Sequence, residues 1–103
     1  MTELITVLAP IKLIEGKTEA DLLAASDRFQ TEFINDEPGV LRRELVRHDD
    51  GSYLDIVQFR SSKDMEDVMV KEQESEACRA FFAVMDVENE ADIKIYTSLE
   101  TYS

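Results

Sequence analysis

The segment at residues 4–14 constrains the fold most, because apolar residues occupy both alternating sets of positions along it. Leu8 belongs to one set, and Ile5 and Val7 belong to the other. Successive side chains of a strand point to opposite faces of the sheet, so this pattern is typical of a central strand buried on two sides. Both faces of the sheet therefore need cover, either from the chain's own helices or from another molecule.

Two segments carry helical signals. Thr18 followed by Asp21 resembles a capping box, and apolar residues then recur at helical spacing until Pro38 and Gly39 turn the chain. Ser61 starts a second apolar stripe that runs to Met85. The polar stretch at residues 71–76 interrupts this stripe, either as a break in the helix or as an exposed turn. A last strand is expected at residues 92–102.

Two further strands, at residues 40–48 and 53–60, flank the turn sequence Asp50-Gly51. A two-residue turn is favoured there and would pair His48 with Tyr53. In that register the face under the helices carries Leu41, Arg43, Leu45, Leu54, Ile56 and Gln58. The opposite face carries Val40, Arg42, Glu44, Val46, His48, Tyr53, Asp55, Val57 and Phe59. A slip of one residue would exchange such sets.

The element order β-α-β-β-α-β predicts a single α+β domain over residues 1–103 with a ferredoxin-like fold. Right-handed crossovers place both helices on one face of a four-stranded antiparallel sheet. The opposite face would then be left bare although it carries valines and aromatic residues. A bare apolar face on a small domain usually marks an interface, so we expect a homodimer formed through this face.

Composition narrows the possible partners. The net charge of −12 disfavours nucleic acid, and no apolar run is long enough to span a membrane. The N-terminus shows no secretion signal, and Cys78 is the only cysteine, which favours a reducing cytoplasm and excludes a thiolate metal site. We therefore expect a cytoplasmic protein that uses no metal.

Three stretches carry a resemblance to a known family. They are residues 38–45 (PGVLRREL) with the hairpin that follows, residues 59–65 (FRSSKDM) and residues 75–81 (SEACRAF). Together they resemble the antibiotic biosynthesis monooxygenase family over nearly the whole chain. The resemblance implies a dimeric α/β barrel and a cofactor-independent monooxygenase that acts on a small aromatic compound of the phenol or quinol type.

The haem-degrading branch of that superfamily uses an asparagine in the first strand, a tryptophan ending the third strand and a histidine in the second helix. Here the first strand lacks asparagine, the tryptophan position reads Phe59, and the histidine position falls near Ala77. These departures argue against haem degradation, and we expect no cofactor.

The candidate site residues lie on the face expected to be bare. The catalytic candidates are His48, Tyr53 and Asp55, because a His–Asp pair can set the tautomer of a base. The candidates for substrate binding are Arg42, Glu44 and Phe59. Each candidate also has an ordinary structural interpretation. His48 would be an exposed histidine of the hairpin. Interface ion pairs would account for Arg42, Glu44 and Asp55, and interface packing would account for Tyr53 and Phe59.

Two functions therefore remain open from the sequence. One is the monooxygenase, and the other is a non-catalytic dimer that binds a small molecule or is purely structural and shares only the fold. The monooxygenase hypothesis predicts an enclosed cavity of ligand size lined by at least one of His48, Tyr53 and Asp55. An interior filled by side chains would contradict it.

Overall fold

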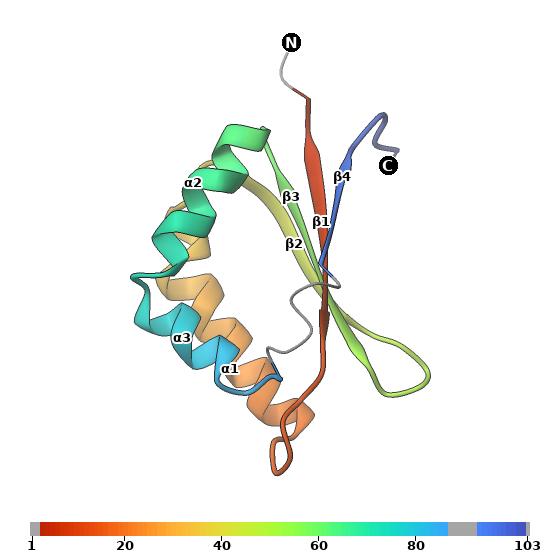
Figure 1. Ribbon diagram of the computed structural model, residues 1–103, viewed down its shortest axis with the longest axis vertical. Helices are drawn as coiled ribbons and strands as arrows, with labels where there is room; N and C mark the ends of the chain where they lie inside the picture. Colours follow the sequence, from red (N-terminus) through yellow and green to blue (C-terminus); the bar gives the residue numbers. More distant parts are fainter. Residues whose placement is uncertain (1–2, 87–92, 103) are drawn as a thin grey trace.

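The computed structural model describes residues 3–86 and 93–102, which form one sheet and a layer of helices (Figure 1). The strands are β1 (Ile5–Ile11), β2 (Val40–Arg47), β3 (Tyr53–Phe59) and β4 (Lys94–Thr97), antiparallel in the order β2-β3-β1-β4. The helices α1 (Glu19–Glu32), α2 (Ser62–Glu72) and α3 (Glu76–Phe82) cover one face, and a 3₁₀ turn at Ile34–Asp36 follows α1. The ferredoxin-like fold is confirmed.

Helix α1 begins where its capping signal predicts. The Thr18 hydroxyl accepts a hydrogen bond from the Asp21 N–H at 3.3 Å, and the Asp21 carboxylate accepts one from the Thr18 N–H at 2.9 Å. Both bonds satisfy backbone N–H groups that have no hydrogen-bond partner within the helix at its N-terminus. The buried face of α1 then carries Leu22, Ser26 and Phe29 at helical spacing.

The second helical segment is two helices, so the polar stretch at residues 71–76 is a break. Helix α2 ends at Glu72, and the Ser75 hydroxyl caps α3 by accepting a hydrogen bond from the Cys78 N–H at 3.1 Å. The break lets each short helix turn its own apolar side toward the sheet. None of the helices in the described ranges is long and apolar enough to cross a membrane.

The hairpin between β2 and β3 has a three-residue turn, which corrects the two-residue turn predicted from Asp50-Gly51. The Gly51 N–H donates to the His48 carbonyl at 2.9 Å, and the His48 N–H donates to the Ser52 carbonyl at 2.8 Å. Gly51 has a φ of +89°, in the left-handed region that glycine adopts at little cost. A type I turn closed by such a glycine shifts the register by one residue, so Tyr53 pairs with Arg47 rather than His48.

This shift exchanges the two faces predicted for β3. The side facing the helices carries Tyr53, Asp55, Val57 and Phe59, whereas Leu54, Ile56 and Gln58 point to the bare face. On β2, Arg43 and Leu45 face the helices, and Arg42, Glu44 and Val46 do not, as predicted. A register irregularity between Val40 and Arg42 turns Val40 into the core and leaves Leu41 exposed, the reverse of the prediction.

The apolar core has two centres. One, led by the fully buried Leu22, joins β1 to α1 and α3, and the other joins β1 and β3 to α2. The first contains Ile11, Leu22, Phe29, Ile34, Cys78, Phe81 and Val84, and the second contains Ile5, Val7, Phe59, Met65 and Val68. The space where these two centres meet is not completely filled, and it forms the site described next.

Candidate active site

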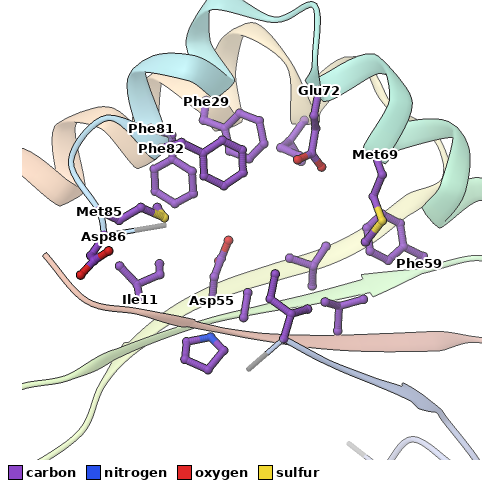
Figure 2. A pocket seen from close by; sticks show the side chains of 16 residues that line it. Ile11, Phe29, Asp55, Phe59, Met69, Glu72, Phe81, Phe82, Met85 and Asp86 are labelled. Atoms are coloured by element: carbon purple, nitrogen blue, oxygen red, sulfur yellow. The ribbon is translucent and has the colours of Figure 1, made fainter. Parts of the chain in front are cut away.

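A cavity of about 140 Å³ lies between the sheet and the helices (Figure 2). Its helix side is aromatic, with Phe29, Phe81 and Phe82, and its sheet side includes Val7 and Val57. Sites for drug-sized ligands measure roughly 300–1,000 Å³, whereas an apolar cavity of roughly 150 Å³ holds a benzene ring. The cavity therefore suits a compound with a single ring.

Asp55 supplies the cavity with a buried carboxylate. It is only 6% exposed, and its Oδ2 accepts a hydrogen bond from Arg43 Nε at 3.1 Å. Its Oδ1 is buried without a hydrogen-bond partner among the residues that the structure describes. Figure 2 shows Asp55 rising from the sheet into the cavity. Burial raises the pKa of Asp55, and the Arg43 guanidinium opposes that rise.

Arg43 holds this carboxylate in place. It donates to the Ser26 hydroxyl at 2.7 Å, to the Ser26 carbonyl at 3.4 Å and to Gln30 Oε1 at 3.3 Å. Its guanidinium carbon lies 5.1 Å from the ring centres of both Phe29 and Phe81. The planar guanidinium suits both the carboxylate and the rings. Arg43 thus ties β2 and β3 to α1 and α3, and its nitrogens are already engaged.

A second carboxyl group enters from the opposite wall. Glu72, the last residue of α2, points from the helices toward the sheet (Figure 2). Burial raises the pKa of Glu72, the Cys78 thiol lowers it by donating to Oε2 at 3.6 Å, and the negative Asp55 raises it again. Three carboxyl residues therefore line the cavity: Asp55, Glu72 and Asp86. Asp55 is paired with a cation, whereas Glu72 accepts a hydrogen bond from a weak thiol donor.

Cys78 is not activated as a nucleophile. Burial, together with the neighbouring Glu72, raises the pKa of its thiol to about 12. A thiol of that kind carries almost no thiolate at neutral pH. Cys78 is therefore a packing residue that also touches the Glu72 carboxyl.

The sequence candidates separate into two groups. Asp55 and Phe59 line the cavity, although they were expected on the bare face. His48 does not, because its side chain is 73% exposed in the hairpin turn, where Nδ1 accepts a hydrogen bond from the Asp50 N–H at 3.1 Å. The expected His48–Asp55 pair is wrong for the same reason: the three-residue turn places the two residues apart.

The remaining candidates also lie outside the cavity. Tyr53 is half-buried on the helix side, and its hydroxyl donates to Glu19 Oε1 at 3.2 Å. Arg42 and Glu44 form an exposed ion pair with each other on the bare face. Their position agrees with the alternative interpretation of these two charges as interface residues.

Two important residues, Arg43 and Glu72, were missing from the sequence candidates. Arg43 did carry a signal, because the sequence placed it on the face under the helices. A buried arginine requires buried acceptors, and an acid on the neighbouring strand can supply one. Glu72 carried no comparable signal, since it lies in a polar stretch whose direction depends on where α2 ends.

The fold is a ferredoxin-like α+β domain with a small apolar cavity between sheet and helices. By sequence, no family model and no curated protein matches the chain. Solved structures do match it by shape. SnoaB, a cofactor-independent oxygenase from Streptomyces nogalater, aligns with a TM-score of 0.76 and 18% identity over 97% of each chain.

Two further structures carry the provisional name antibiotic biosynthesis monooxygenase. The one from Bordetella bronchiseptica has a TM-score of 0.72 and 16% identity, over 98% of this chain and 100% of its own. The one from Caulobacter crescentus has a TM-score of 0.71 and 18% identity, over 96% of this chain and 92% of its own. The resemblance noted in the sequence is thus confirmed for the fold, which is that of the antibiotic biosynthesis monooxygenases.

Proposed function

We propose that this protein is a cofactor-independent monooxygenase that oxygenates a small, electron-rich aromatic compound in the cavity between sheet and helices. The observation that carries the proposal is the buried carboxylate of Asp55, which lines an apolar cavity of about 140 Å³. The shared fold with SnoaB, a cofactor-independent oxygenase, supports it. The lining of this cavity by Asp55, one of the three catalytic candidates, also supports the proposal.

Asp55 is the proposed general base. Its carboxylate removes the proton of a phenolic hydroxyl, and the surrounding apolar walls leave the resulting anion poorly solvated and electron-rich. This anion transfers electrons to dioxygen directly. One oxygen atom becomes the new carbonyl of a quinone, and the other leaves as water with the hydrogens of the phenolic O–H and of the attacked ring C–H. The substrate itself is the reductant, so the reaction balances without another electron donor.

The test is oxygen uptake with a panel of phenols and hydroquinones. We expect uptake by the wild type, and a rate lower by about a hundredfold in Asp55→Asn, because the amide cannot accept the proton. His48→Ala is the matched control, and its rate should be unchanged because His48 is exposed outside the cavity. An unchanged rate in Asp55→Asn would contradict the proposed base. Binding without any uptake would favour the non-catalytic alternative.

We also propose that the bare face of the sheet joins a second copy of this chain. The face carries Leu8 and Ile56 beside Tyr96, which is 48% exposed. Its charged residues Arg42, Lys94 and Glu44 sum to +1, on a chain whose net charge is −12. A second copy can therefore approach this face without the repulsion that the rest of the surface imposes. Two such faces related by a two-fold axis would shield each other's apolar residues.

Sedimentation tests this dimer. The wild type should sediment at twice the chain mass of 11.8 kDa, and Ile56→Glu should give a folded monomer because it would bury unpaired charges at the interface. Leu23→Glu, an equal change at a position on α1 that is 47% exposed, is the control and should remain dimeric. A wild type at 11.8 kDa with no concentration dependence would refute the dimer.

A further inference from the structure

We infer that Glu72 is a second proton-transfer residue of the proposed reaction: it gives a proton to the peroxide formed on the substrate ring and then removes the proton of the attacked ring carbon. This role rests on the proposed function, in which Asp55 takes only the first proton, that of the phenolic hydroxyl. The position of Glu72, its lack of an ion partner and the proton balance of the reaction each support it.

Glu72 reaches the cavity from the side opposite Asp55. It ends α2 and lines the cavity from the helices, whereas Asp55 lines it from β3 (Figure 2). The next two residues, Gln73 and Glu74, are exposed, but Glu72 is partly buried in the cavity wall. A compound held between sheet and helices therefore lies between two carboxyl groups, so one can serve its hydroxyl and the other the oxygen that adds to the ring.

Glu72 has no ion partner among the residues that the structure describes. Its Oε2 accepts a weak hydrogen bond from Cys78 Sγ at 3.6 Å, and no described residue donates to its Oε1. The nearby cation Arg43 is paired with Asp55 at 3.1 Å. Burying a carboxyl group without a cation is unfavourable, and such groups gather at functional sites.

The surroundings of the two carboxyl groups separate acid from base. Burial raises the pKa of Glu72, the Cys78 thiol lowers it, the negative Asp55 raises it and Arg43 lowers it. Arg43 donates a hydrogen bond directly to the Asp55 carboxylate and so favours its ionised form. Asp55 is therefore the base, and Glu72 is the group that holds a proton.

The protons of the reaction balance with these two groups alone. After Asp55 has taken the phenolic proton, dioxygen adds to a ring carbon that still carries hydrogen, and Glu72 protonates the outer oxygen of the resulting peroxide. The Glu72 carboxylate then removes the proton of that ring carbon. The C–H electrons form the new carbonyl as the O–O bond breaks, and Asp55 returns its proton to the departing hydroxide. Both carboxyl groups end as they began.

The kinetic test is oxygen uptake by Glu72→Gln with the panel of phenols and hydroquinones. We expect a rate lower by about a hundredfold, because the amide keeps the shape of the side chain but cannot give up a proton. Wild-type uptake should rise with pH as Asp55 loses its proton and fall again as Glu72 loses its own. Glu72→Gln should keep the rise and lose the fall. Glu74→Gln is the matched control in the same polar stretch, and its rate should be unchanged because Glu74 is exposed.

Carbon-13 NMR of the glutamate carboxyl groups follows the proton on Glu72 in the wild type without any substrate. The Glu72 signal, identified as the one missing from Glu72→Gln, should titrate above the ordinary value of 4.5. Asp55→Asn should lower the pKa of Glu72, because a neighbouring negative charge is removed. Titration of Glu72 at or below 4.5 would overturn its role as an acid whatever the uptake measurements show.

The remaining outcomes separate the role of Glu72 from the reaction itself. Uptake by the wild type that Glu72→Gln leaves unchanged would overturn the role of Glu72 alone. A slower Glu72→Gln that keeps both limbs of the pH profile would also overturn it, since the residue would then act only through the structure. No uptake by the wild type with any compound of the panel would overturn the monooxygenase, and the role of Glu72 with it.

Discussion

Arg43→Met is expected to lower the free energy of unfolding by about 3–5 kcal/mol, as measured by urea denaturation at neutral pH. Methionine keeps the length and the apolar stem of the side chain but removes the guanidinium. The Asp55 carboxylate, 6% exposed, then loses its ion partner at 3.1 Å, and Ser26 and Gln30 lose their donor. Removing one partner of a buried ion pair lowers the free energy of unfolding by more than the intact pair contributes to it, because the other charge remains buried without a partner.

The loss should depend on pH in a defined direction. Without Arg43, nothing opposes the effect of burial on Asp55, so its pKa in the folded state rises further above the ordinary value of 3.8. Between the unfolded and folded pKa values the native state holds a proton that the unfolded state has released, so stability falls as the pH rises through that window. The deficit of Arg43→Met should therefore be smallest below pH 3.8 and grow toward neutral pH. Glu72 is present in both proteins and affects the comparison less.

A double variant separates charge from packing. Arg43→Met combined with Asp55→Leu removes both partners, and it should recover much of the lost stability because an apolar pair can replace a buried ion pair. A deficit that is independent of pH and persists in the double variant would show that the guanidinium stabilises by packing on Phe29 and Phe81 instead.

The fold was predictable because several local signals agreed with one another. The two-sided apolar pattern of β1, the capping box at Thr18 and the turn residues around Gly51 each act over a few residues, and all point to the same topology. Even the division of the second helix was visible as a polar interruption. Such signals depend on local chemistry, so a sequence without a structure can reveal them.

The site was predictable only in part, because a shift of one residue in the pairing of β2 with β3 decides which side chains of β3 face the helices. The choice of a three-residue turn at Asp49-Asp50-Gly51 moves every side chain of β3 to the other face, and Asp-Gly is compatible with both turns. Asp55, which lines the cavity, was therefore expected on the wrong face, and His48 was expected as its partner in error. Glu72 depends on tertiary packing at the end of α2, which no local pattern records.

Phe81→Ala is the second change with a large expected effect. Phe81 is 3% exposed, stacks on Phe29 and lies 5.1 Å beneath the Arg43 guanidinium, so its removal should cost about 3–5 kcal/mol. Phe82→Ala is the matched control on the same helix. Its side chain is 41% exposed, so it should lose less than half as much in the same denaturation experiment.

The same variant tests whether Phe81 sets the size limit of the cavity. Removing its ring joins new space to the existing 140 Å³, so a two-ring phenol such as 2-naphthol should bind to Phe81→Ala and not to the wild type. A ligand that fills the void should also restore part of the lost stability, because binding to the native state alone raises the free energy of unfolding. If 2-naphthol binds both proteins equally, Phe81 does not limit the site.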